Sequence, residues 1–185
     1  MVSYKYRKST FTKEQTLSLT ETALNIVEEN KEDKIISYKD IKSIRLSFIL
    51  DRMGPENFLC TIKSPAGYTS ITSSSYVSFA NFNRNKEDYS IFVKELIKNA
   101  TLANPSIQLI SGSSKASYFL TITMMVVFAI AIALLFYFIG ESISSITWVN
   151  FAIVLLSVPM MIAYIRKNKP GNFSADNIPE KLLPH

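Results

Sequence analysis

Short stretches of alternating apolar and polar residues fill the chain between residues 14 and 79. Turn-forming residues separate these stretches at intervals of about 8 to 12 residues, which is typical of antiparallel strands joined by hairpins. The clearest stretch places Ile44, Leu46 and Phe48 on one face, with polar residues between them. The pattern therefore predicts six or seven strands, each with one buried face.

The hydrophobic period changes near residue 89. Apolar residues then recur at steps of three and four, as expected for one buried stripe of an amphipathic helix; they are Tyr89, Phe92, Val93, Leu96, Ile97 and Ala100. Asn85, three residues before Asp88, predicts a side-chain cap at the helix start, and Asn104-Pro105 predicts the end. Strands followed by one helix indicate an α+β domain in which the helix packs over the open end or face of a curled antiparallel sheet.

Two long apolar runs follow, at residues 118–139 and 146–165, and neither contains Asp, Glu, Lys, Arg or His. As a helix the first run is about 33 Å long, enough to cross a hydrocarbon core of about 30 Å. We therefore expect three parts: a domain at residues 1–115, a two-helix transmembrane hairpin at 116–166 and a Pro-containing tail at 167–185.

Basic residues beside the two runs predict the orientation of this hairpin. Lys115 precedes the first run, and Arg166, Lys167 and Lys169 follow the second, whereas the link between the runs has no Lys or Arg. Basic residues near membrane spans stay on the cytoplasmic side. We expect both termini in the cytoplasm, and we expect the three residues after the second run to contact anionic lipid as well.

The segment Ile36-Ser37-Tyr38-Lys39-Asp40-Ile41-Lys42-Ser43-Ile44 and the helical stripe containing Phe92, Val93 and Leu96 resemble a bacterial pleckstrin-homology-like (PH-like) domain of the YcxB-like type. The chain as a whole, including its tail from Asn168 to Pro184, is similar to bacterial membrane proteins that join such a domain to a transmembrane hairpin. The resemblance implies a curled antiparallel sheet or barrel with one C-terminal helix, held in the bacterial cytoplasmic membrane. It transfers no catalytic site.

Candidate catalytic chemistry is sparse. The one histidine, His185, is the final residue, and Cys60 is the one cysteine, so neither a Ser-His or Cys-His dyad on a rigid element nor the usual zinc site can be assembled. Cys60 is expected to be a small core residue. The net charge of +5 is spread along the chain without a groove-reading motif. We expect no enzymatic activity, no cofactor, no metal and no nucleic-acid partner.

Four basic residues on the first predicted strand and the loop after it form the best local candidate for a ligand: Lys5, Arg7, Lys8 and Lys13. They lie close to where, by the resemblance, PH domains hold lipid headgroups. Each such cation is worth about 1 kcal/mol near an anionic membrane. The alternative, which we favour, is a solvated sheet edge whose charges discourage pairing with other strands.

Further contacts are predicted in the tail and in the first apolar run. Four large apolar residues stand among prolines in the tail and predict an extended segment docked on its own domain or on a partner, with a disordered tail as the alternative; they are Phe173, Ile178, Leu182 and Leu183. Ala129 and Ala133 permit close helix approach, either within the hairpin or in a homo-oligomer.

The sequence thus favours a non-enzymatic integral membrane protein that presents a cytoplasmic PH-like module to a protein or peptide, as a candidate subunit of a membrane complex. One alternative is a membrane component that handles lipid or small molecules. Another is an immunity-type protein against a membrane-targeted toxin. Membrane lipid and a protein are the expected partners, and the sequence leaves the identity of the protein and the oligomeric state open.

Overall fold

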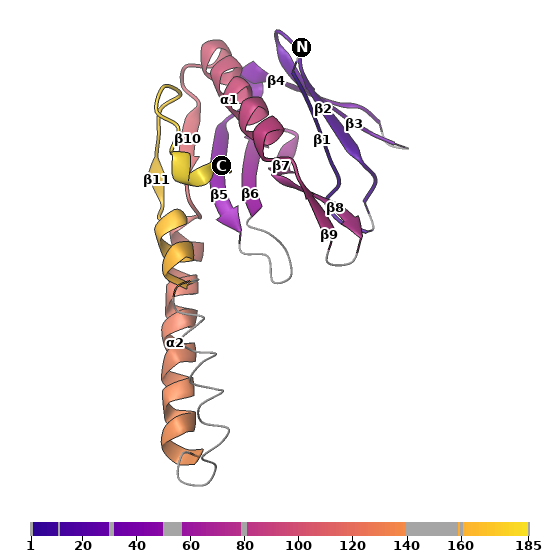
Figure 1. Cartoon of the computed structure of the whole chain (residues 1–185). Coiled ribbons are helices and arrows are strands. Elements are labelled where there is room, and N and C mark those ends of the chain that lie inside the picture. The colour runs from indigo at the N-terminus through magenta and orange to yellow at the C-terminus, as the bar shows by residue number, and fades with distance from the viewer. Residues whose placement is uncertain are drawn as a thin grey trace. The chain divides into compact units, whose positions relative to one another are not determined.

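The computed structural model describes residues 2–10, 12–29, 32–49, 57–78, 81–139, 159 and 161–184. The chain divides into two compact units: unit 1 comprises residues 1–112 and 171–185, and unit 2 comprises residues 113–170. Unit 1 combines antiparallel sheets with a helix (Figure 1), so the α+β class predicted from the sequence is confirmed.

Three sheets build the described part of unit 1. The first has the strand order β1-β2-β3-β4, the second β11-β10-β5-β6-β7, and the third is the hairpin β8-β9. The strands are β1 (Ser3–Tyr6), β2 (Gln15–Leu19), β3 (Ala23–Glu28), β4 (Lys34–Ser37), β5 (Ser43–Ile49), β6 (Asn57–Ser64), β7 (Gly67–Thr72), β8 (Ser74–Ser78), β9 (Asn81–Arg84), β10 (Gln108–Ser111) and β11 (Gly171–Asn172).

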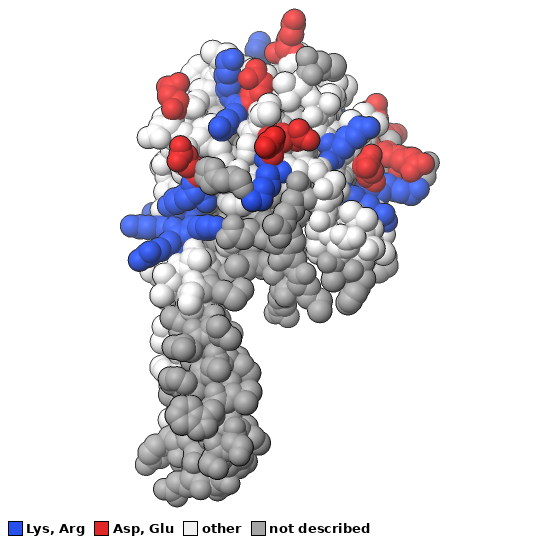
Figure 2. All heavy atoms as spheres, viewed as in Figure 1, with Lys and Arg blue, Asp and Glu red and all other residues white. Residues whose placement is uncertain are grey.

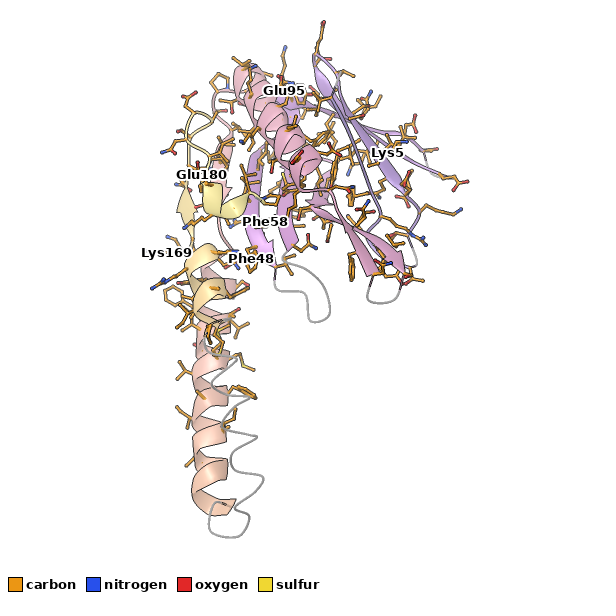
Figure 3. All side chains as sticks on the ribbon, viewed as in Figure 1. Lys5, Phe48, Phe58, Glu95, Lys169 and Glu180 are labelled. Carbon is orange, nitrogen blue, oxygen red and sulfur yellow. The ribbon has the colours of Figure 1, made fainter. Side chains whose placement is uncertain are left out.

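The predicted alternation in the second sheet is confirmed. The three alternating apolar residues of β5 are buried, and each pairs with a buried residue of β6, in the register Ile44↔Ile62, Leu46↔Cys60 and Phe48↔Phe58. The rings of Phe48 and Phe58 meet edge to face with centroids 5.5 Å apart, and Figure 3 shows them at neighbouring ends of the two strands. One face of this sheet therefore belongs to the core.

The segment after β6 forms two strands, β7 and β8, that belong to different sheets. The chain breaks at Ser73, which still exchanges hydrogen bonds with Phe58, while the next residues turn toward β1: the backbone N–H of Arg7 donates to Ser75 Oγ (2.9 Å), and that of Tyr76 donates to the Arg7 carbonyl (2.8 Å). The break is invisible to a period count because every residue on both sides of it is compatible with a strand.

The predicted amphipathic helix is confirmed as α1 (Lys86–Ala103), whose predicted stripe is fully buried. Its N-cap residue is Asn85, as expected, but the Asn85 side chain does not cap the helix. It donates instead to the Lys5 carbonyl at 3.2 Å. The capping expectation is wrong because a backbone carbonyl of β1 competes for the same amide.

Two tyrosines of β1 join the first sheet to the second. Tyr4 donates through its hydroxyl to the Thr72 carbonyl, and Tyr6 donates to the Ser70 carbonyl, both at 2.6 Å. The Tyr4 ring also packs against Tyr89 of α1, with centroids 5.9 Å apart. Hydroxyls from the core thus satisfy the backbone carbonyls of β7, which would otherwise be left unpaired at the sheet edge.

Sequence patterns missed the end of the second sheet. Strand β10 runs parallel to β5, with Leu109 opposite Ile44, and β11 adds antiparallel to β10. The pairing of Ser111 with Gly171 is close: a Cβ atom on Gly171 would stand 2.9 Å from Ser111 Oγ. Two- and four-residue strands are too short for a periodicity to be recognised.

Unit 2 contains α2 (Lys115–Ile139), which begins where Ser114 Oγ accepts the backbone N–H of Ser117. Within the described part of the chain, one helix is long and apolar enough to cross a membrane, and its window Lys115–Ile132 has a mean hydropathy of 1.8 with none of its residues buried. Of the second predicted span, only Pro159 and residues 161–165 are described, and these are helical. The two-helix hairpin stays a prediction.

Candidate functional site

The tail, residues 171–184, folds back onto unit 1. After β11, Phe173 donates its backbone N–H to the Leu109 carbonyl at 3.1 Å, and the chain continues to the short 3-10 helix η2 (Glu180–Leu182), which contacts β5. Ser90 of α1 donates through its hydroxyl to the Pro184 carbonyl at 3.2 Å. The tail therefore lies on the α1 side of the second sheet.

The four tail residues singled out from the sequence occupy different environments. Leu182 and Leu183 are buried, with exposed fractions of 0% and 4%. Phe173 and Ile178 are half-buried. The two leucines are part of the core of unit 1, while the other two line its surface.

A groove of about 820 Å³ separates the tail from α1, and we call it the tail groove. One wall is a face of α1 on which the lining residues recur mainly every four residues, and the other wall is the tail itself. The lining residues are Ser90, Lys94, Glu95, Lys98 and Leu102 on α1, and Ala175, Asp176, Ile178, Glu180, Leu183 and Pro184 on the tail. Figure 3 labels one acidic residue on each wall, Glu95 and Glu180. Leu102 is 74% exposed, so the groove has an uncovered apolar end.

Charge on this face is mixed in sign. Figure 2 shows blue and red side chains interspersed over the face of unit 1 that carries α1. In the tail groove Lys94 and Lys98 stand on the helix wall, and Asp176 and Glu180 stand on the tail wall. A polar and apolar lining of this kind suits a peptide segment better than a purely apolar ligand.

The structure does not unite the four basic residues of the first hairpin into one cationic site. Arg7 is used by its own loop: its guanidinium donates to the carbonyls of Ser9 (3.1 Å), Thr10 (2.8 Å) and Thr12 (2.7 Å). Lys13 pairs with Glu29 at 2.9 Å. Both side chains thus serve local structure or local charge balance.

The other two residues of this group are also separated. Lys5 is exposed on β1. Lys8 lines a hollow of about 260 Å³ together with Glu28 and Glu32. Glu28 is itself 9% exposed and accepts a hydrogen bond from Gln15 Nε2 at 2.6 Å. Carboxylates in the hollow offset the charge of Lys8.

The predicted residues near the membrane segment lie in unit 2. Arg166 and Lys169 are exposed and Lys167 is half-buried; Figure 3 labels Lys169. On α2, Ala129 is exposed, whereas the side chain of Ala133 lies outside the described residues. The proposed small-residue contact therefore stays a prediction.

The two ends of unit 2 meet. Ser113, just before α2, donates its backbone N–H to the Asn168 carbonyl at 3.1 Å, and the Ser113 hydroxyl also donates to this carbonyl, at 3.4 Å. Asn168 ends the helical turns of residues 161–167 by donating its N–H to the Tyr164 carbonyl (2.9 Å), and it is 1% exposed. The chain thus departs from Ser113 and comes back beside it at Asn168, within unit 2.

Sequence reasoning missed a third hollow, of about 430 Å³, on the second sheet. It is lined by Lys42, Ser43, Arg45, Thr61, Lys63, Tyr68, Gln108 and Ile110. The alternation of β5 already placed Arg45 on the polar face. The alternation could not reveal the rest of the hollow. Lys63 and Gln108 come close to Arg45 only because β6 and β10 pair with β5, and β10 is far from β5 in the sequence.

Cys60, expected from the sequence to be a core residue, is fully buried, and burial raises the pKa of its thiol to about 12. A thiol with such a pKa is protonated at neutral pH and unreactive. Among the described residues there is no group of three or more His, Cys, Asp or Glu side chains arranged to hold a metal ion.

Comparison of the chain with protein-family models, with curated proteins and with solved structures finds no match.

Proposed function

We propose that this chain is a non-enzymatic, membrane-anchored binding protein, in which α2 and the returning segment form a two-helix anchor and unit 1 is a PH-like module for a protein partner. The observation that carries the proposal is the return of the chain: Ser113 and Asn168, at the two ends of unit 2, are joined by hydrogen bonds.

A returning chain constrains how the segment between these residues crosses a bilayer. The 25 residues of α2 extend about 37 Å away from Ser113, and the chain is back beside Ser113 at Asn168. A segment whose two ends meet has crossed a membrane an even number of times. This supports two spans with both flanks on one side.

The surface of α2 supports insertion into lipid. Its described side chains after Ser117 are mostly apolar, and many of them are exposed, with exposed fractions above one half for Phe119, Leu120 and Met124, among others. A helix that is apolar all round and not covered by protein is stable in hydrocarbon and unstable in water. No acidic or basic residue follows Lys115 within α2, which agrees with a lipid-facing anchor.

The arrangement of unit 1 supports the PH-like assignment. Strands β1 to β4 form one antiparallel sheet, β5 to β7 form antiparallel neighbours in a second, and α1 follows them. This agrees with the curled sheet and single C-terminal helix that the sequence resemblance implies. The hairpin β8-β9 and the strands β10 and β11 are additions to that plan.

The tail groove is the proposed partner site. Its helix wall presents Lys94, Lys98 and the exposed Leu102, and its opposite wall is an extended segment already held on unit 1. A partner segment lying between the walls finds apolar contacts at Leu102 and Ile178 and charges of both signs along the rim. A protein segment with mixed charge and a few large apolar side chains matches this lining.

Two chemical features favour binding over catalysis. The Cys60 thiol is buried and its pKa is raised, so it is not a nucleophile at neutral pH. The carboxylates Glu28 and Glu32 line a surface hollow together with Lys8, and the Glu28 carboxylate already accepts a hydrogen bond from Gln15.

Photo-crosslinking in native membranes tests the proposal. A photoreactive amino acid replaces Lys98 or Leu102 in the full-length chain, and a matched control replaces Ile35, which is 67% exposed on β4. We expect one protein to be crosslinked in stoichiometric amount from positions 98 and 102 and not from position 35. Mass spectrometry of the purified chain identifies it.

Three outcomes would contradict the proposal. If alkaline carbonate released the chain from membranes, α2 and the returning segment would not form a membrane anchor. Crosslinking that is equal at positions 35 and 98 would remove the tail groove as a specific site. Retention of a tightly bound lipid in place of any protein would favour the lipid-handling alternative.

A further inference from the structure

The third hollow lies on the face of the second sheet opposite to α1 and the tail. Strand register places its residues in two adjacent rows, one containing Gln108, Ser43, Lys63 and Tyr68, and the other containing Ile110, Arg45 and Thr61. The buried residues that alternate with them along the strands, such as Ile44 and Ile62, point to the other face, where α1 lies. We call the hollow the outer-face hollow.

The outer-face hollow differs in charge from the other two. Its lining includes three cations, Lys42, Arg45 and Lys63, and no Asp or Glu among the described residues. The hollow at Lys8 contains two carboxylates, and the tail groove contains three. Like charges gathered on one face repel one another, and a bound anion removes that cost.

Neighbouring groups supply hydrogen-bond donors of the kind that a phosphate oxygen accepts. Arg45 carries five N–H donors, of which one is directed to the Gly112 carbonyl at 3.2 Å. The hydroxyls of Ser43 and Thr61 and the amide of Gln108 line the same hollow. Charge-assisted N–H and O–H contacts of this kind bind phosphate groups most strongly.

An aromatic side chain closes the hollow on the β7 side. The Lys63 ammonium stands 5.7 Å from the centroid of the Tyr68 ring, and Tyr68 is 69% exposed. This contact restricts Lys63 while leaving its ammonium in reach of solvent. The cation is thus held over the sheet before an anion arrives.

We propose that the outer-face hollow is a binding site for a phosphate group, with Lys42, Arg45 and Lys63 as its cations. The inference goes beyond the partner site proposed above and does not depend on it. It also replaces the first hairpin as the anion site, because Arg7 and Lys13 are already used locally. The phosphate group comes either from a phospholipid headgroup or from a soluble molecule.

Hydrogen exchange of the full-length chain in lipid nanodiscs tests the proposal and separates the two sources. In phosphatidylcholine discs, added inorganic pyrophosphate slows amide exchange in peptides covering residues 42–47 and 60–64 if the source is soluble. In discs containing phosphatidylglycerol, the same peptides are protected without added pyrophosphate if the source is lipid. Either result supports a phosphate site at this hollow.

Charge-matched variants make the test specific. Lys42 and Lys63 are exposed, so the double variant Lys42→Gln, Lys63→Gln should keep the fold. It should lower the affinity of the hollow for the protecting anion at least about ten-fold. The control Lys5→Gln, Lys13→Gln removes the same charge elsewhere and should leave the protection unchanged. Absence of protection in both kinds of disc, or equal loss in the two variants, would overturn the proposal.

Discussion

At the scale of single residues, three of the buried tyrosines in the core of unit 1 differ in their hydrogen bonding. Tyr4 and Tyr6 donate to carbonyls of β7, whereas the hydroxyl of Tyr89 has no partner among the described residues. A satisfied hydroxyl stabilises the fold, and a buried hydroxyl without a partner destabilises it. The same substitution should therefore have opposite effects at these positions.

We expect Tyr89→Phe to raise the free energy of unfolding by up to about 1 kcal/mol, because it removes an unsatisfied polar atom and keeps the ring. Tyr4→Phe should lower it by about 1 to 2 kcal/mol, because the Thr72 carbonyl loses its donor. Chemical denaturation of the full-length protein measures both. A loss of stability in Tyr89→Phe equal to that in Tyr4→Phe would show that the hydroxyl of Tyr89 is bonded.

Buried acids of the core also predict the response to alkali. Burial raises the pKa of Cys60 to about 12 and raises the pKa of Tyr4, Tyr6 and Tyr89 as well. Above pH about 9 the unfolded chain loses protons that the folded chain keeps, so stability falls as pH rises. Each such group lowers the free energy of unfolding by about 1.4 kcal/mol per pH unit over the pH range in which it is protonated in the folded chain and ionised in the unfolded chain.

We expect the free energy of unfolding to decline between pH 9 and pH 11, with a smaller slope in Cys60→Ala than in the native chain. Denaturation at several pH values measures the slope. Stability that stays constant from pH 8 to pH 11, or equal slopes in the two proteins, would contradict burial of the thiol in the core.

At the scale of elements, sequence patterns predicted what depends on local period and missed what depends on pairing. The stripe of α1 and the alternation of β5 are local and were predicted correctly. The break at Ser73, the parallel strand β10 and the strand β11 arise from distant partners such as Arg7, Ile44 and Ser111. For the same reason Arg45 was recognised as polar but not as a neighbour of Lys63.

The tail gives a prediction at this scale. Leu182 is fully buried and the adjacent Lys181 is exposed. Leu182→Ala should lower the free energy of unfolding by about 2 to 4 kcal/mol, because it leaves a cavity in the core, whereas Lys181→Ala should change it by less than about 0.5 kcal/mol. Thermal melting of the full-length protein compares them.

Truncation after Lys169 extends this test to the whole tail, because it removes β11 together with η2. It should lower the melting temperature at least as much as Leu182→Ala does, and it should speed amide exchange in β10. A truncated chain that melts like the native one would mean that the tail does not stabilise unit 1.

At the scale of the whole molecule, the proposed anchor requires that the segment between Ser113 and Asn168 crosses the membrane an even number of times. The contact of Ser113 with Asn168 supports it from the structure, and the basic residues Lys115, Arg166, Lys167 and Lys169 support a cytoplasmic placement of both flanks from the sequence. Unit 1, which contains residues from both flanks, can form only if they lie on the same side.

Cysteine labelling in intact cells tests this claim most directly. Cys60 is buried and is replaced by alanine, and single cysteines are then introduced at the exposed Thr10 and at Ser144 in the predicted link. We expect a membrane-impermeant reagent to label Ser144→Cys in intact cells and to label Thr10→Cys only after the membrane is opened. Labelling of Thr10→Cys in intact cells together with protection of Ser144→Cys would contradict the account.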